Sequence, residues 1–241
     1  MPRPSPRTTP RPDDGLVEAS PRLVPVHEPA SAEGAVLVLH GGASRGDGVR
    51  VSPAQLSVVR MVATARACAR AARGRLAVYR LLNTFRGWDA THTPVADCDW
   101  AIEKVADRYP SAPVGLVGHS LGGRAALVAG DSAAVRSVAV LNPWLYPADD
   151  PELSGRSVLF VHGGHDRIAS IATSEAVARR LTRRTSVGFI RIPDGKHAML
   201  RHGSAFDGYA ASFTAAVLLG DPTLASGPVA RVLSGESWLT A

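Results

Sequence analysis

Continuous apolar runs alternate with amphipathic segments along most of the chain. Residues 35–40 (AVLVLH) are almost wholly apolar and stop at two glycines, which is typical of a strand buried on both faces. In the segment 53–73 the apolar side chains recur at helical spacing, as at Leu56, Val59, Val62 and Ala63. The same pattern predicts further strands at 23–26, 76–82, 114–117, 138–141, 158–162 and 187–192, and further helices at 95–109, 121–129, 170–182 and 205–219. This alternation predicts an α/β fold, with a mostly parallel central sheet and helices on both faces.

The two ends of the chain lack this alternation. Residues 1–15 are rich in proline, arginine and threonine and have little to bury, so we expect a disordered tail there. Residues 16–220 carry the whole pattern, and their number fits one domain. Residues 221–241 are poorly patterned, and we expect a C-terminal tail that packs weakly at most.

Composition removes several classes of protein. With 45% hydrophobic and 20% charged residues the chain is not disordered as a whole, and its apolar runs fall far short of the ~20 residues that span a bilayer. The N-terminal segment lacks the apolar stretch of a secretory signal. Lys and Arg exceed Asp and Glu by 27 to 21, which we interpret as a solvated basic surface. We therefore expect neither a nucleic acid nor a membrane as partner.

Cysteine is scarce in this chain. Cys68 and Cys98 are the two cysteines, and no C-x-x-C motif is present. This usage excludes a disulfide-rich secreted scaffold. Two reduced thiols and a cytoplasmic localisation are the expectation.

The most specific motif lies between a predicted strand and a predicted helix. Residues 114–123 read VGLVGHSLGG, in which Gly118, Ser120 and Gly122 form G-x-S-x-G. A serine on so tight a turn needs neighbours without a Cβ, and the free N–H groups of the following helix suit a developing oxyanion. A glycine-rich turn with an incidental serine is the alternative. A phosphate-binding P-loop is excluded, because no Lys-Ser/Thr follows the glycines.

The segment GHSLGG resembles the nucleophile elbow of the α/β-hydrolase family, and the family's order of strands and helices matches roughly residues 35–219. The resemblance implies a Ser-Asp-His triad in that order along the chain, with Ser120 as the nucleophile. Asp166 follows the strand at 158–162, where the family places its acid, and His197 follows the last strand as the general base. Asp149, Asp150 and Asp194 are competing acids, and His202 is a reserve base.

The segment His40-Gly41-Gly42-Ala43 resembles the family's oxyanion loop. The implied donors are the backbone N–H groups of Gly42 and Leu121, with Ala43 as an alternative, while His40 braces the loop. His162 and His165 form H-x-x-H, but no cysteine or carboxylate cluster joins them, so we expect no metal site. The chemistry that the triad implies needs no cofactor.

The segment between residues 142 and 157 is short and contains three prolines, so it leaves no room for a lid domain. An open site without a hydrophobic cap weakens the case for a true lipase. The candidate walls of the site lie just past the strand ends: Phe85, Trp88, Trp144, Tyr146 and Met199. Of these, Trp88, Trp144 and Met199 are the substrate-binding residues that we expect.

The sequence thus predicts a lidless serine hydrolase of carboxylic esters or thioesters that acts through an acyl-enzyme. Its partner would be a small-molecule ester or acyl substrate. An amidase, a peptidase or an acyltransferase would use the same triad. A non-catalytic binding protein on this fold is the alternative from another class.

Overall fold

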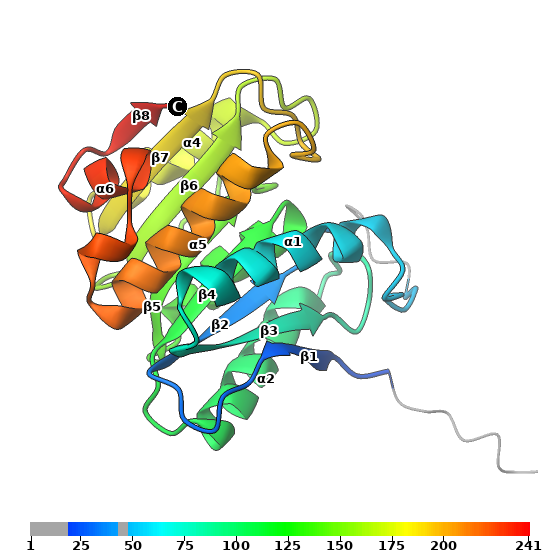
Figure 1. Ribbon diagram of the computed structural model, residues 1–241. Coiled ribbons are helices and arrows are strands. Elements are labelled where there is room, and N and C mark those ends of the chain that lie inside the picture. The colour runs from blue at the N-terminus through cyan, green and yellow to red at the C-terminus, as the bar shows by residue number, and fades with distance from the viewer. Residues whose placement is uncertain (1–18, 43–47) are drawn as a thin grey trace, which may run out of the picture.

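The computed structural model describes residues 19–42 and 48–241. Their centre is an eight-stranded sheet in the order β1-β3-β2-β4-β5-β6-β7-β8 (Figure 1). β1 pairs with β3 antiparallel, and the other neighbours pair parallel, which confirms the predicted sheet. The strands are β1 (Arg22–His27), β2 (Gly34–Leu39), β3 (Leu76–Leu82), β4 (Val114–His119), β5 (Val135–Leu141), β6 (Ser157–Gly163), β7 (Ser186–Ile192) and β8 (Trp238–Thr240). The expected tail at 1–15 lies outside the described residues.

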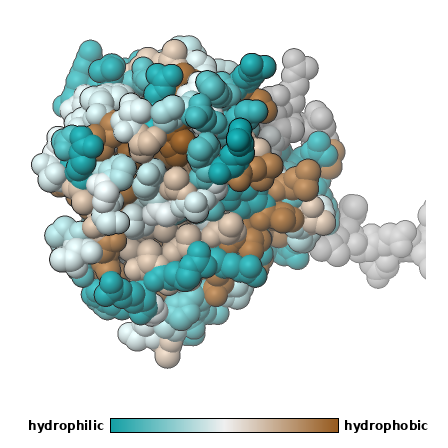
Figure 2. Space-filling view, turned by 45° about the horizontal axis from the view of Figure 1, so that its top comes forward, coloured by the Kyte–Doolittle hydropathy of each residue, from teal (hydrophilic) through white to brown (hydrophobic). Residues whose placement is uncertain are grey.

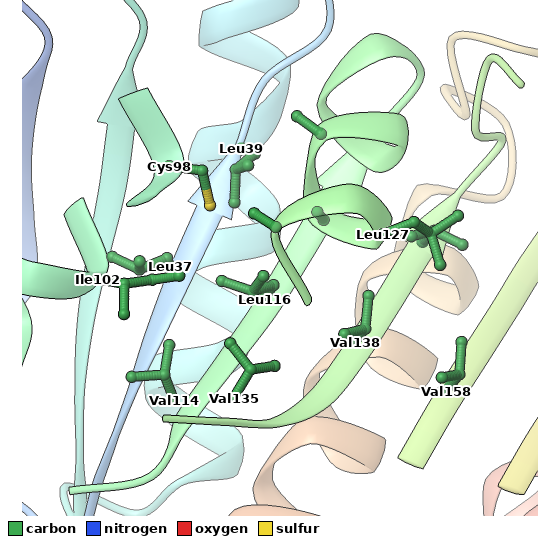
Figure 3. Packing of buried hydrophobic residues seen from close by; sticks show 14 of the residues in the cluster. Leu37, Leu39, Cys98, Ile102, Val114, Leu116, Leu127, Val135, Val138 and Val158 are labelled. Carbon is green, nitrogen blue, oxygen red and sulfur yellow. The ribbon is translucent and has the colours of Figure 1, made fainter. Parts of the chain in front are cut away.

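Helices cover both faces of the sheet, as predicted. They are α1 (Leu56–Ala71), α2 (Thr93–Arg108), α3 (Leu121–Val128), α4 (Ile171–Leu181), α5 (Gly203–Leu219) and α6 (Gly227–Leu233), with 3₁₀ turns η1 (Ala129–Asp131) and η2 (Pro222–Leu224). Successive side chains of a strand enter opposite layers. In β2, Leu37 packs with Ile102 on the α2 side (Figure 3), while Val38 packs with Met61 on the α1 side. The aliphatic runs therefore form two core layers, one on each side of the sheet.

The apolar residues whose spacing predicts α1 are not all buried in it. Leu56 and Val59 belong to that spacing, yet they are 85% and 48% exposed. The buried positions are Val58, Met61, Thr64, Ala65 and Cys68. Both stripes of the helix carry apolar residues, so packing against α5 and the sheet decides which one is buried. The exposed stripe becomes important at the candidate site.

The C-terminal segment also differs from expectation. Residues 221–241, expected as a weakly packed tail, contain η2, α6 and β8, and β8 pairs with Phe189, Ile190 and Arg191 of β7. Val229 and Leu239 are buried. A helix of seven residues and a strand of three are too short to show a hydrophobic period. This segment therefore completes one edge of the sheet.

Residues 142–156 join β5 to β6 without any helix or strand, so no lid domain is inserted there. In the part of the chain that the structure describes, no helix combines the length and the apolar character needed to cross a membrane.

Candidate active site

Ser120 stands on the turn that connects β4 to α3. Its backbone angles, φ 55° and ψ −120°, fall in a region that residues other than glycine rarely adopt. A Cβ on Gly118 would lie 2.2 Å from the carbonyl oxygen of Gly122, and a Cβ on Gly122 would lie 2.5 Å from that of His40. The two glycines are therefore required for the turn to close against β2, and this packing holds Ser120 in its strained conformation.

Replacing Gly122 with alanine is expected to destabilise the fold, because the new methyl group would meet backbone that cannot move aside. We expect the free energy of unfolding to fall by about 3 kcal/mol in urea denaturation. Gly208 in α5 provides the matched control, since a Cβ there meets nothing within 4 Å. Gly208→Ala should raise stability by roughly 0.5–1 kcal/mol. Equal effects of the two substitutions would contradict this account of the turn.

The structure brings the three expected triad side chains together. His197 Nε2 lies 2.9 Å from Ser120 Oγ, and His197 Nδ1 lies 2.8 Å from Asp166 Oδ2. The other oxygen of Asp166, Oδ1, accepts the backbone N–H groups of Ile168 and Ala169 at 2.8 and 2.9 Å. Burial alone would raise the pKa of Asp166, but these hydrogen bonds, with that of His197, lower it below its ordinary value. Because an ionised Asp166 can only accept, Nδ1 carries the imidazole proton and Nε2 is free to accept the proton of Ser120.

The competing acids have other partners. Asp149 accepts two hydrogen bonds from Arg124, at 2.9 and 2.8 Å, and a third from the N–H of Tyr146. Asp150 pairs with arginines of the α4 segment. Asp194 is exposed, 3.8 Å from His165. Asp166 is thus the carboxylate that the described structure places against His197.

Two buried histidines flank the triad without belonging to it. His119 donates from Nε2 to the carbonyl oxygen of His197 at 2.9 Å, and burial lowers its pKa to about 3. His162 lies behind the acid, with Nε2 3.3 Å from the Ala169 oxygen and 3.6 Å from Asp166 Oδ2, and burial lowers its pKa to about 4. Both rings are therefore neutral at pH 7. His119 thus contacts the backbone of His197, and His162 lies beside the carboxylate of Asp166.

A buried asparagine, which the sequence analysis missed, fixes the loop that carries His197. Asn142 Nδ2 donates to the carbonyl oxygens of Lys196 and His197, both at 3.1 Å, and its Oδ1 accepts the N–H of Gly163 at 2.7 Å. Asn142 is fully buried and directly follows β5. Its place at a strand end, just before Pro143, was the available signal. It ties the ends of β5 and β6 to the loop after β7.

The segment after β2 lies beside Ser120. A Cβ on Gly41 would be 3.2 Å from that of Ser120, and one on Gly42 would be 2.0 Å from the Arg86 carbonyl oxygen. Leu121 is the first residue of α3, so its N–H has no acceptor within the helix. His40 braces this segment as expected, with Nδ1 2.7 Å from the Gly41 oxygen and Nε2 accepting the N–H of Asn83. Ala43, the alternative donor, lies outside the described residues.

An open cavity of about 590 Å³ surrounds Ser120 and His197. Its lining is mainly apolar and comprises Gly41, Gly42, Leu56, Ser57, Val59, Arg60, His119, Ser120, Leu121, Trp144, Ile168, His197, Ala198 and Leu200. Trp144 is thus a wall of the site, as expected. Leu56, Val59, Ile168 and Leu200 were missed as lining residues, because they come from segments far apart along the chain.

Two of the expected substrate-binding residues do not line the cavity. Trp88 is 9% exposed, and its ring lies under the guanidinium of Arg124, 4.1 Å from ring centroid to Cζ. Met199 is 1% exposed and belongs to the core layer of α1 and α5. Its φ of 59° marks a tight turn, so the residues on either side of it, Ala198 and Leu200, line the cavity instead. Phe85 and Tyr146 are not lining residues either, although Tyr146 packs against Trp144 at 5.0 Å between ring centroids.

The histidines of H-x-x-H do not converge on a metal site. His162 is fully buried, whereas His165 is exposed and faces Asp194. Residues 19–42 and 48–241 contain no group of three or more His, Cys, Asp or Glu side chains placed to hold a metal ion.

No protein-family model and no curated protein matches the sequence. Solved structures do match the fold. Est1E from Butyrivibrio proteoclasticus, with bound ferulic acid, is 14% identical, with a TM-score of 0.60 over 83% of this chain and 96% of its own. An esterase domain from Rhodothermus marinus is 16% identical (TM-score 0.57, 83% and 99% covered), and a lidless α/β serine hydrolase from Xanthomonas campestris is 18% identical (TM-score 0.55, 81% and 94% covered). The chain therefore has the α/β-hydrolase fold.

Proposed function

We propose that this protein is a serine hydrolase that cleaves carboxylic esters or thioesters through an acyl-enzyme. The observation that carries the proposal is the pair of hydrogen bonds, 2.9 and 2.8 Å long, that links Ser120 through His197 to Asp166 beside an open cavity. This arrangement is the one that activates a serine hydroxyl. Structures of similar fold include an esterase domain and a lidless serine hydrolase, and that of Est1E carries a carboxylic acid.

Acylation follows from the positions of these groups. Ser120 Oγ attacks the substrate carbonyl carbon while its proton passes to His197 Nε2. The carbonyl oxygen becomes an oxyanion, which the N–H groups of Leu121, at the start of α3, and Gly42, in the segment after β2, would stabilise. Asp166 stabilises the imidazolium that forms on His197. The imidazolium then gives its proton to the leaving oxygen or sulfur as the bond to the carbonyl carbon breaks.

Deacylation repeats the sequence with water. His197 takes a proton from a water molecule, whose oxygen attacks the acyl-enzyme carbonyl. Collapse of the second oxyanion returns the proton to Ser120 Oγ and releases the carboxylic acid. Every proton is moved by His197, so the residues described here complete the cycle by themselves. The open, lidless cavity favours small-molecule substrates that enter it directly from solution.

The test is a panel of p-nitrophenyl esters, matched thioesters and matched amides, combined with labelling by a fluorophosphonate. We expect turnover of esters or thioesters and a phosphonate adduct on the peptide that contains Ser120. Folded protein that neither labels nor hydrolyses any of them would contradict the proposal. Turnover of amides alone would indicate an amidase, and an acylated alcohol among the products would indicate an acyltransferase.

A further inference from the structure

Large apolar side chains gather at the mouth of the cavity. Of the large hydrophobic residues exposed in the described part of the chain, four line the cavity: Leu56 (85% exposed), Val59 (48%), Ile168 (68%) and Leu200 (81%). We call these four residues the apolar rim. Figure 2 shows apolar side chains gathered between hydrophilic ones on the side of the molecule that it presents. Exposing apolar side chains to water is unfavourable, and covering them with a ligand is favourable. Their concentration around Ser120 therefore indicates a ligand contact.

Two residues of the apolar rim belong to the segments that carry Asp166 and His197, and the other two lie in a helix bonded to the His197 loop. Leu200 is three residues after His197, and Ile168 is two residues after Asp166. Leu56 and Val59 lie in the first turns of α1, which Arg60 fastens to the same loop by donating from Nε to the Ala198 oxygen at 3.2 Å. The rim therefore surrounds the His197 side of the cavity.

The charge within this part of the lining is neutralised. Arg60 is 12% exposed at its side chain and donates to both carboxylate oxygens of Asp207, at 3.2 and 3.1 Å. Thr64 donates a further hydrogen bond of 2.6 Å to Asp207. A guanidinium held in this way is not free to bind a substrate carboxylate. The His197 side of the cavity thus favours an uncharged, apolar group.

Proton transfer decides which part of an ester lies there. The leaving oxygen must receive its proton from His197 Nε2, so that oxygen has to lie within hydrogen-bonding distance of Nε2. The group attached to it then lies on the His197 side of the cavity. We propose that the apolar rim is the subsite for the leaving group and that the substrates are esters or thioesters of a large apolar alcohol or thiol. In the step concerned, the carbonyl C–O or C–S bond breaks, the proton of Nε2 moves to the leaving atom, and the alcohol or thiol departs past the rim. This inference rests on the proposed hydrolase activity.

Two ester series test the subsite. In one, the acyl group stays acetyl and the alcohol lengthens from ethanol to octanol; in the other, the alcohol stays ethanol and the acyl chain lengthens from acetyl to octanoyl. With every ester below its solubility limit, we expect kcat/KM to rise roughly two- to fourfold for each methylene of the alcohol. The rise along the acyl series should be smaller. An equal or steeper rise along the acyl series would overturn the assignment.

Substitutions in the rim, compared with a matched valine outside it, test whether the preference for long alcohols comes from the rim. Val59→Ala should lower the ratio of kcat/KM for octyl acetate over ethyl acetate, and Leu56→Ala with Leu200→Ala should lower it further. Val49 is 44% exposed and does not line the cavity, so Val49→Ala should leave the ratio unchanged. Unchanged ratios in the rim variants would overturn the subsite. Absence of both turnover and phosphonate labelling would instead remove the hydrolase proposal itself.

Discussion

Replacing Ser120 with alanine is expected to lower kcat for ester hydrolysis by about 10⁶-fold and to abolish fluorophosphonate labelling. The reason is chemical, because alanine keeps the Cβ and removes only the oxygen that attacks. The hydroxyl makes one hydrogen bond to His197 in this structure, so its loss should change the free energy of unfolding by about 1 kcal/mol or less. Steady-state kinetics and urea denaturation of the same preparation measure both quantities.

Ser137 in β5 is a matched control for this substitution. It is fully buried, like the core around it, and its Oγ has no hydrogen-bond partner among the described residues. Ser137→Ala should therefore keep both the activity and the labelling. If Ser120→Ala retained more than about one part in a hundred of the activity, another nucleophile would have to be sought.

Replacing Asp166 with asparagine is expected to lower kcat by about 10⁴-fold. An amide can donate a hydrogen bond to His197 Nδ1, which would favour the tautomer with the proton on Nε2, so that the base could no longer accept the proton of Ser120. The imidazolium would also lose its neighbouring negative charge. A pH series of kcat/KM for the variant and the wild type measures the effect.

Asp149→Asn separates Asp166 from Asp149, one of the competing acids that the sequence offers. Asp149 binds Arg124, and the side chains of both residues are about a tenth exposed. Loss of its charge should cost roughly 1–3 kcal/mol of folding stability. The link between His197 and Asp166 stays intact, so kcat should remain close to that of the wild type. The opposite outcome, an active Asp166→Asn enzyme and an inactive Asp149→Asn enzyme, would move the acid to the segment between β5 and β6.

Helices and strands were predicted from the sequence more accurately where the apolar run is longer. The strand at 76–82 was predicted with its observed bounds, because seven consecutive residues, six of them buried, show the pattern plainly. β8 and α6 were missed, since three and seven residues carry no readable period. The helix α1 was predicted, but apolar residues occupy two of its stripes, so the sequence does not show which stripe is buried. One of those stripes packs on α5, and the other borders the cavity.

The candidate site, too, has features that the sequence predicts and features that it does not. The sequence by itself determined the turn at Ser120, because the two glycines required there leave few other interpretations, and it determined the order in which Ser120, Asp166 and His197 follow one another. Only the tertiary structure decided between Asp166 and Asp149. It also placed Met199 in the core and brought Ile168 and Leu200 to one cavity mouth. A tight turn is imposed by steric contacts between near neighbours in the chain, and sequence reports these directly. A cavity wall is made by segments that meet through packing of the whole sheet, so no local pattern contains it.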